Sequence, residues 1–368
     1  MKVAHITSGV RGLATYALNQ YNYFERTGGV ENLVITSSKW RKQPIRVHEL
    51  DSWLIGKVLP WPKHVKEAMA KLNEYHPDII HHHHPAGRLD FKAAMFKRRM
   101  KVPMVTTIHM SVGSRKYFVD KIMNGFFVAS RRNLSKSDCY VAISKYVKKQ
   151  LEEMGGLPKE RIVLLYAGVD EKVFAPMPRT PHDTLEISFV GQIMHEKGID
   201  MLIDVVIRLA KEKKVRLNII GEGNLKAALQ LRTRNHPEIN WVGYLNSQAK
   251  VAEFYAKSDV VVLPNRWDEA FSYIPLESMS CGTAIIASRV GGNGESIVDG
   301  KTGLLFNVGD EEQLYHLLRD TSMAQFWEMG THGREHVLKN FTLDLFGAKY
   351  KRLYDNLMTN PDVIEQID

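Results

Sequence analysis

Short runs of apolar residues alternate with amphipathic stretches along the whole chain. In the first half, the runs that we expect to be strands are 3–6, 32–36, 78–81, 104–108, 139–143 and 162–166. Several of the intervals between them have helical periodicity, beginning with 14–24, which follows a turn containing Gly9 and Gly12. Strands that alternate with helices predict a parallel sheet covered by helices.

The second half of the chain repeats this plan. Its expected strands are 187–190, 215–220, 240–242, 260–263 and 284–286. Between the halves, the segment 170–185 has three prolines and little periodicity, which is typical of a linker. A chain of 368 residues also exceeds what one ordinary core accommodates.

We therefore predict an α/β fold with two Rossmann-like domains that face each other across a cleft. Residues 1–178 would form the N-terminal domain, and residues 179–342 the C-terminal domain. The helical pattern over 343–358 predicts that residues 343–368 form a C-terminal helix that packs back on the first domain.

The composition, with 44% apolar and 25% charged residues, is that of a globular protein. The N-terminus enters its first strand without the pattern of a signal peptide, and no apolar run approaches the roughly 18–20 residues that span a bilayer. The cysteines, Cys139 and Cys281, are far apart in the sequence. These features favour the cytoplasm.

Positive charge is concentrated in the first half. Residues 1–178 hold 29 Lys and Arg against 15 Asp and Glu, so the remainder is mildly acidic. Such a half could attract an anionic membrane, a phosphorylated carrier or nucleic acid, or it could be a solvated face. The segment 92–101, with Lys97, Arg98 and Arg99, is a candidate for contact with anionic lipid or a phosphorylated acceptor, the alternative being a solvated helix face.

Two glutamates frame the segment 269–277, which follows the strand 260–263 and leads into a helical stretch. Ligands of open α/β sheets bind at the carboxyl ends of strands, and a helix N-terminus there favours an anion such as a diphosphate. A carboxylate facing the phosphates would be repelled, whereas sugar hydroxyls would donate hydrogen bonds to it. We expect Glu269 and Glu277 to hold sugars.

The Glu-x7-Glu segment resembles the motif of retaining GT-B glycosyltransferases, closest to family 4. Further similar segments, in chain order, are GVD at 168–170, FVGQ at 189–192, EKGID at 196–200, IGEG at 220–223, GG at 291–292 with Glu295, and TGLL at 302–305. The resemblance covers the second half throughout. It is weaker over the first half, where Gly9, Gly12, the strand 78–81 and the segment 106–109 carry it.

The resemblance implies that the N-terminal domain binds the acceptor and that the C-terminal domain binds the nucleotide sugar. It also implies a set of site residues. The catalytic residues would be His109, Lys197 and Glu269. Lys197 would contact the diphosphate and stabilise the charge that grows on the leaving nucleotide, and His109 would contact the donor sugar, the alternative being a buried structural histidine. The residues that bind the nucleotide sugar would be Gly9, Gly12, Gln192, Lys197, Tyr244, Leu245, Phe271, Ser272, Tyr273, Ile274 and Glu277.

Two positions call for separate comment. Gln192 stands where the family usually has arginine, so either Arg11 compensates for the lost charge or turnover is slow. The run 81–84 consists of four histidines, but adjacent side chains of a strand alternate in direction and do not all face one ion. We expect no metal site there.

The expected function is the transfer of a hexose from a UDP- or GDP-sugar to a glycan or lipid-linked acceptor, with retention of configuration and without a metal or other cofactor. A role in cell-envelope polysaccharide or lipopolysaccharide synthesis, at the inner face of the membrane, would suit the basic half, and nucleic acid is not expected as a partner. Two alternatives stay open. One is a sugar-nucleotide epimerase or hydrolase of the same fold, and the other is a non-catalytic basic protein that binds nucleic acid or membranes.

Overall fold

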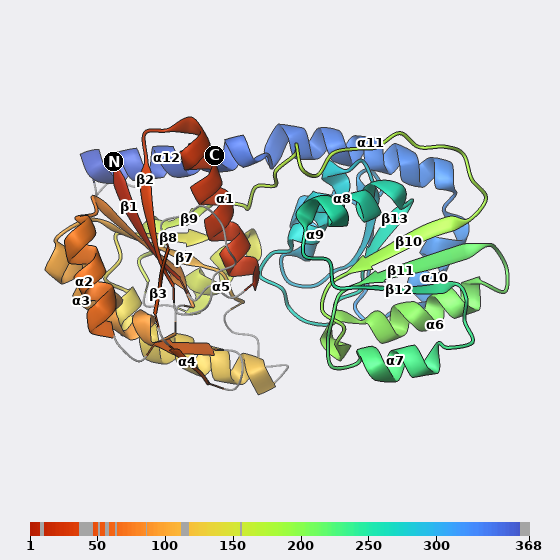
Figure 1. Cartoon of the computed structure of the whole chain (residues 1–368), viewed down its shortest axis with the longest axis horizontal. Coiled ribbons are helices and arrows are strands. Elements are labelled where there is room, and N and C mark those ends of the chain that lie inside the picture. Colours follow the sequence, from red (N-terminus) through yellow and green to blue (C-terminus); the bar gives the residue numbers. More distant parts are fainter. Residues whose placement is uncertain are drawn as a thin grey trace. The chain divides into compact units, whose positions relative to one another are not determined.

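The structure, a computed structural model, describes residues 1–7, 11–36, 47–50, 52–55, 59–62, 65–85, 87–111, 118–154 and 157–360. The chain divides into two compact units, each built around a parallel sheet (Figure 1). The first unit comprises Met1–Gly168 together with the chain from Leu343 onward, and the second is Val169–Thr342. The predicted pair of Rossmann-like domains is confirmed.

The first unit has a seven-stranded sheet in the order β3-β2-β1-β6-β7-β8-β9, with all neighbouring strands parallel. Its strands are β1 (Lys2–Thr7), β2 (Glu31–Thr36), β3 (Val47–Glu49), β6 (Ile79–His84), β7 (Met104–Ile108), β8 (Cys139–Ala142) and β9 (Ile162–Leu164). A separate antiparallel pair consists of β4 (Ser52–Ile55) and β5 (Leu59–Pro62). The short strand β3 and this pair were not predicted, and β6 extends through the whole histidine run.

Helices cover this sheet, and one of them comes from the far end of the chain. They are α1 (Arg11–Thr27), α2 (Val65–Tyr75), η1 (Gly87–Lys92), α3 (Ala93–Met100), α4 (Phe118–Leu134), α5 (Lys145–Met154), η2 (Lys159–Arg161) and α12 (Leu343–Thr359). Helix α12 packs beside α1 (Figure 1). Tyr16 and Tyr350 join the two helices through hydroxyl groups 2.8 Å apart, and Gln20 donates a hydrogen bond of 3.3 Å to Tyr354.

The second unit has a six-stranded parallel sheet in the order β12-β11-β10-β13-β14-β15. Its strands are β10 (Leu185–Val190), β11 (Val215–Ile220), β12 (Ile239–Gly243), β13 (Val260–Leu263), β14 (Ala284–Ser288) and β15 (Gly303–Phe306). Its helices are η3 (His195–Lys197), α6 (Ile199–Leu209), α7 (Lys226–Arg232), α8 (Gln248–Lys257), α9 (Tyr273–Ser280), η4 (Asn293–Ser296), α10 (Glu311–Asp320) and α11 (Met323–Asn340). Apolar side chains of α6, α10 and the central strands form its core.

The boundary between the units lies ten residues before the predicted one. We expected residues 170–178 to belong to the first domain and to a linker, because of their prolines. In the structure the second unit begins at Val169, and Phe174 is buried there with its ring 6.2 Å from that of Tyr255. Arg334 also donates hydrogen bonds to the carbonyl oxygens of Glu171 and Phe174. Phe174 therefore packs into the second unit, whereas the prolines at 176, 178 and 181 are exposed.

No helix among the described residues combines the length and the apolar character needed to cross a bilayer.

Candidate functional site

In the second unit, three predicted site residues follow the two strands at which the order of the sheet reverses. Successive strands run outward from β10 to β12 on one side and from β13 to β15 on the other, so the reversal lies between β10 and β13. Gln192 and Lys197 follow β10, and Glu269 follows β13. A reversal of this kind leaves a crevice at the carboxyl ends of the two strands, where open α/β sheets bind their ligands.

The structure brings Lys197 and Glu269 into direct contact. The Lys197 Nζ atom forms an ion pair with Oε1 of Glu269, and the two side chains are only 20% and 17% exposed. Burial lowers the pKa of Lys197 to about 8, and the neighbouring Glu196 has a smaller, opposite effect on it. Contact with the Glu269 carboxylate also favours the charged ammonium group. The pair is thus shielded from bulk water yet reachable by a ligand.

The turn that carries Lys197 depends on a glycine. Gly198 ends η3 and starts α6 with φ of 67°, a conformation that favours glycine. A Cβ atom at this position would lie 2.0 Å from the carbonyl oxygen of Pro264. The missing side chain therefore lets the loop after β10 lie directly against the loop after β13.

Arg266 ties the same two loops together. Its guanidinium group donates hydrogen bonds of 2.9 Å to the His195 carbonyl oxygen and 2.6 Å to Oδ1 of Asp200. Its backbone N–H donates to the carbonyl oxygen of Glu196. We did not predict this residue as part of the site, although its place shortly after β13 was a usable signal.

Two further glycines fix the backbone of Glu269. A Cβ atom on Gly291, where φ is 54°, would lie 2.2 Å from the Glu269 carbonyl oxygen. The N–H group of Gly292 donates a hydrogen bond of 2.7 Å to that same oxygen. The diglycine segment after β14 thus holds the loop that presents Glu269.

Helix α9 begins within the predicted motif. Ser272 is its N-cap and accepts a hydrogen bond of 3.4 Å from the N–H group of Ile274. Phe271 and Tyr273 flank this cap and are partly buried. Ser272 therefore caps α9 in addition to its predicted place among the residues that bind the nucleotide sugar.

Glu277 lies on α9, one turn after the cap. Its Oε2 atom accepts a hydrogen bond of 3.0 Å from the hydroxyl group of Tyr255, on α8. Burial raises the pKa of Glu277 to about 7, although the Tyr255 hydrogen bond lowers it. The carboxyl group is therefore about half ionised at neutral pH.

The other predicted residues of this unit are more exposed. Gln192 is exposed after β10, while Tyr244 and Leu245 follow β12, two strands away from the reversal. Tyr244 is 52% exposed. Gln192 is therefore accessible beside the reversal, and Tyr244 is accessible after the edge strand β12.

Buried amides that we did not predict lie in the loops after β13 and β14. Within the described residues, the side-chain amides of Asn265 and Asn293 have no hydrogen-bond partner, although both are fully or almost fully buried. Buried polar groups without partners carry a free-energy cost, so each such group calls for an explanation. The position of both loops beside the sheet reversal makes these amides candidates for contact with a ligand.

In the first unit, His109 follows β7 and is partly buried. Its Nε2 atom lies 3.0 Å from Nδ1 of His83, and the ring of Tyr16 packs edge-on against it at 4.6 Å. Burial lowers the pKa of His109 to about 3, so the imidazole is neutral. Gly12 lies in the first turn of α1, whereas Gly9 falls outside the described residues. Compensation for Gln192 by Arg11 stays a prediction.

The histidine run points to both faces of β6. His82 and His84 lie 2.9 and 3.1 Å from Oδ1 of Asp90. Burial raises the pKa of Asp90, but the two histidines outweigh that effect and hold it at about 2. His81 and His83 stack on each other with ring centroids 4.0 Å apart. All four histidines are fully buried, and neighbours in the run do not share a face.

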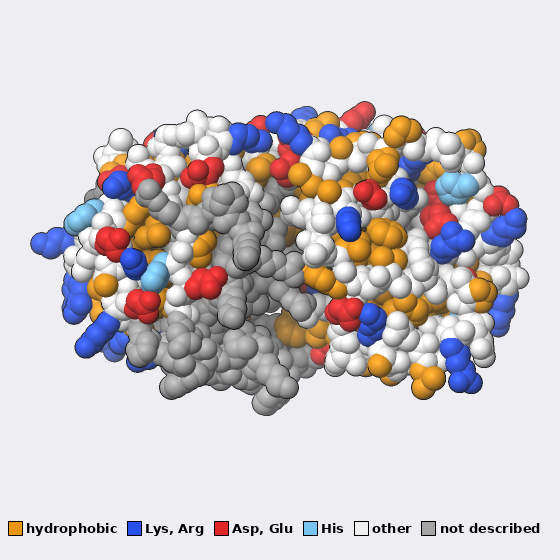
Figure 2. Space-filling view, viewed as in Figure 1, with side chains coloured by type: hydrophobic (Ala, Val, Ile, Leu, Met, Phe, Trp, Pro, Cys, Tyr) orange, Lys and Arg blue, Asp and Glu red, His pale blue; other side chains and the backbone are white. Residues whose placement is uncertain are grey.

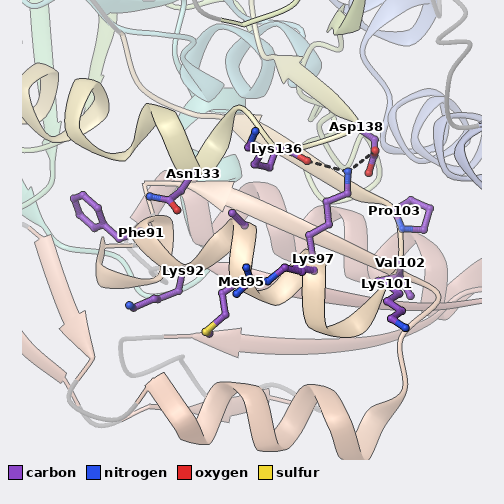
Figure 3. A pocket seen from close by; sticks show the side chains of 12 residues that line it. Phe91, Lys92, Met95, Lys97, Lys101, Val102, Pro103, Asn133, Lys136 and Asp138 are labelled. Carbon is purple, nitrogen blue, oxygen red and sulfur yellow. Dashed lines mark hydrogen bonds and ion pairs between the residues drawn. The ribbon is translucent and has the colours of Figure 1, made fainter.

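A basic pocket of about 930 Å³ lies between α3, α4 and the starts of β7 and β8. Figure 3 shows Lys97 reaching the Lys136 carbonyl oxygen at 2.9 Å and Asp138 at 2.5 Å. The remaining basic residues of the wall are Lys92, Arg98 and Lys101, which lie beside apolar side chains such as Met95. Figure 2 shows Lys and Arg gathered at the edge where Figure 1 places α2 and α3. The pocket lies at the opposite end of β7 from His109.

Comparison with known proteins agrees with this arrangement. Residues 184–321 match the family model of group 1 glycosyl transferases, and residues 10–173 match that of glycosyltransferase family 4. An uncharacterized glycosyltransferase of Methanocaldococcus jannaschii is 30% identical over 76% of this chain and 76% of its own. The N-acetyl-alpha-D-glucosaminyl L-malate synthase of Bacillus anthracis is 28% identical over 76% of this chain and 75% of its own. The fold is similar to that of Anabaena HepE in complex with UDP-glucose, with a TM-score of 0.80, 16% identity and coverage of 97% of this chain and 100% of that one.

Proposed function

The chain belongs to the GT-B glycosyltransferases, and we propose that it transfers a hexose from a UDP-sugar to a glycan or lipid-linked acceptor with retention of configuration. The observation that carries the proposal is the pair of Lys197 and Glu269 at the sheet reversal of the second unit. A cation and a carboxylate side by side match a donor whose diphosphate and sugar are adjacent. UDP is favoured over GDP because HepE was solved with UDP and UDP-glucose.

In this proposal the two residues divide the donor between them. The Lys197 ammonium group binds the diphosphate and stabilises the negative charge that develops as the sugar–phosphate bond breaks. The Glu269 carboxylate accepts hydrogen bonds from the sugar hydroxyls, and Glu277 accepts them from the ribose. The N-terminus of α9, with its cap at Ser272, adds backbone N–H groups that favour an anion.

Retention requires that the new bond form on the face from which the leaving group departs. We propose that the sugar–phosphate bond breaks while the acceptor hydroxyl attacks from that same face, and that the departing phosphate oxygen takes the hydroxyl proton. Positioning and electrostatic stabilisation then supply the rate, and Lys197 takes the place that a metal ion would otherwise fill. Activity that survives a chelator would support this assignment, and activity restored only by a divalent cation would contradict it.

Ligand-induced thermal stabilisation tests the donor class. A ligand that binds only the folded state raises its apparent stability, so UDP, GDP and their sugar conjugates are compared on the wild type and on Lys197→Met. We expect UDP compounds to stabilise the wild type and Lys197→Met to lose that effect. Lys213→Met is the matched control, because Lys213 is another partly buried lysine of this unit that binds the carbonyl oxygens of Leu318 and Arg319. No stabilisation by any nucleotide sugar would contradict the proposal.

Product analysis then separates transfer from its rivals. Incubation of the donor without an acceptor yields free sugar if the enzyme is a hydrolase and an altered sugar nucleotide if it is an epimerase. We expect both of these products to form more slowly than the transfer product forms with an acceptor extract. We also expect an α-linked donor to give an α-linked product. A β-linked product would overturn retention.

We also propose that the basic pocket binds anionic lipid or a phosphorylated lipid carrier. Such binding would suit a role in envelope-glycan synthesis at the inner face of the membrane. Lys92, Arg98 and Lys101 supply the charge and Met95 an apolar surface. Sedimentation with vesicles of anionic and neutral lipid tests this. Binding that requires anionic lipid and falls in the double variant Arg98→Gln/Lys101→Gln would support the contact, and binding unchanged by these substitutions would exclude it.

A further inference from the structure

Four residues of the first unit form one continuous hydrogen-bond chain that ends at His109. Asn32 Oδ1 lies 3.1 Å from His5 Nε2, His5 Nδ1 lies 3.1 Å from His83 Nε2, and His83 Nδ1 lies 3.0 Å from His109 Nε2. The residues come from β2, β1, β6 and the end of β7, which are consecutive strands of the sheet. Asn32, His5 and His83 are at most 2% exposed.

The amide of Asn32 sets the direction of the whole chain. Its Nδ2 atom lies 3.5 Å from the Val30 carbonyl oxygen, a long contact that orients Oδ1 toward His5. A carbonyl oxygen only accepts, so His5 must carry its proton on Nε2 and accept at Nδ1. His83 then donates from Nε2 and accepts at Nδ1, which leaves the His109 Nε2 atom as the last donor.

This argument requires that each ring carry a single proton. Burial lowers the pKa of His5 to about 4 and that of His109 to about 3, and it holds the pKa of His83 well below its usual range. All three imidazoles are therefore neutral around pH 7. A neutral imidazole has one N–H donor and one acceptor, so a chain anchored at one end has only one consistent arrangement.

We propose that Asn32, His5 and His83 are positioning residues that hold His109 in its Nε2–H tautomer. Nδ1 of His109 then acts toward a ligand only as a hydrogen-bond acceptor. Within the described residues, no partner for this atom is present. The group it suits is a hydroxyl that donates, as on the transferred sugar, and not a phosphate oxygen, which itself accepts. This last step rests on the proposed glycosyltransferase function.

The same histidines could be mistaken for a metal site, because ring nitrogens of His5, His81 and His83 lie within 4.8 Å of one another. Their nitrogens already have partners. His81 binds the Tyr354 hydroxyl at 2.5 Å and the Thr107 hydroxyl at 2.7 Å, and His5 and His83 are bound within the chain. A metal ion would have to replace these hydrogen bonds in a fully buried site.

Nitrogen-15 NMR of the histidine rings tests the proposal without any assay of transfer. A protonated and an unprotonated ring nitrogen have distinct shifts, and the His109 signals are identified by their loss in His109→Gln. We expect the wild type to show His109 protonated at Nε2. In Asn32→Leu the chain loses its anchor, and we expect the Nδ1–H form of His109 to appear.

Two variants control for a merely structural effect. Asn32→Gln keeps an uncharged amide oxygen as the acceptor at the anchor and is expected to keep the Nε2–H form. His81→Gln removes a histidine of equal burial on the same strand that lies outside the chain, so His109 should not change. If Asn32→Leu does not fold, the wild-type spectrum alone decides, because an Nδ1–H tautomer there overturns the proposal.

Activity provides the second readout. Loss of the hydrogen bond between His109 Nδ1 and a hydroxyl of the donor corresponds to about a tenfold rise in KM for the donor. We expect this rise in Asn32→Leu and no such rise in His81→Gln. Stabilisation of the wild type by Zn²⁺ that His5→Gln abolishes would replace the proposal by a metal site. If the tautomers are as expected but no nucleotide sugar binds, the hydrogen-bond chain stands and the proposed function fails.

Discussion

The ammonium group of Lys197 and the carboxylate of Glu269 form a shielded ion pair, although the two residues follow different strands. Removal of one member leaves the other charge poorly compensated, whereas removal of both does not. We expect Lys197→Met to lower the free energy of unfolding by more than Lys197→Met/Glu269→Gln does. The double-mutant cycle, measured in urea, should give a coupling of about 1–3 kcal/mol. Purely additive effects would contradict the contact.

Donor binding should weaken at alkaline pH. The pKa of Lys197 is lowered to about 8, so the lysine is charged below that pH and loses its proton as the pH rises through it. We expect donor affinity to be level between pH 6 and roughly 7.5 and then to fall by up to about tenfold per pH unit. Calorimetric titration of UDP at several pH values measures this. Lys197→Arg is the control, because arginine stays charged and should abolish the alkaline fall.

Glu277 should make stability depend on pH in the opposite sense to most carboxylates. Its pKa is raised in the folded state to about 7 from an ordinary value near 4.5. The folded protein therefore holds a proton that the unfolded chain has lost, and this contribution to stability is full below pH 4.5 and disappears as the pH rises through 7. Glu277→Gln should thus be more stable than the wild type above pH 7, by about 3 kcal/mol. Below pH 4.5 the difference should vanish, and a constant difference across the range would contradict the assignment.

Gly291 should tolerate no side chain, unlike another glycine with a similar backbone. Gly291 has φ of 54° and lies against the Glu269 carbonyl oxygen, whereas Gly309 has φ of 77° and nothing within 4 Å of a Cβ position. Gly309→Ala should cost only the conformational strain, about 1 kcal/mol. Gly291→Ala should cost at least about 2 kcal/mol and weaken donor binding, because Glu269 must move. Equal losses in the two variants, measured by denaturation and UDP titration, would mean that the close approach is unimportant.

The sequence supports a large part of the fold because periodicity is a local signal. The strands β7, β11 and β13 have the predicted bounds, and α12 begins at the predicted residue. The error at 170–178 has a clear cause, since prolines indicate irregular backbone but do not reveal that Phe174 is buried. The three residues of β3 are too few to show a period.

The candidate site was predictable only in part. The motif identified Lys197 and Glu269, but their contact depends on how the loops after β10 and β13 meet. The same is true of Arg266, which acts through the backbone of the neighbouring loop. The partners of His109 depend on the order of four strands, which no local pattern gives. Side chains from distant segments meet only through the sheet, so their relationships had to come from the structure.

The return of α12 to the first unit bears on how the protein is made. A ribosome releases the chain from the N-terminus, so residues 1–168 emerge long before α12, whose buried Tyr350 and Tyr354 complete their packing. The second unit is continuous in sequence and has all its parts once Thr342 has emerged. Synthesis therefore leaves the surface of α1 that packs against α12 without its partner until the chain beyond Thr342 has emerged.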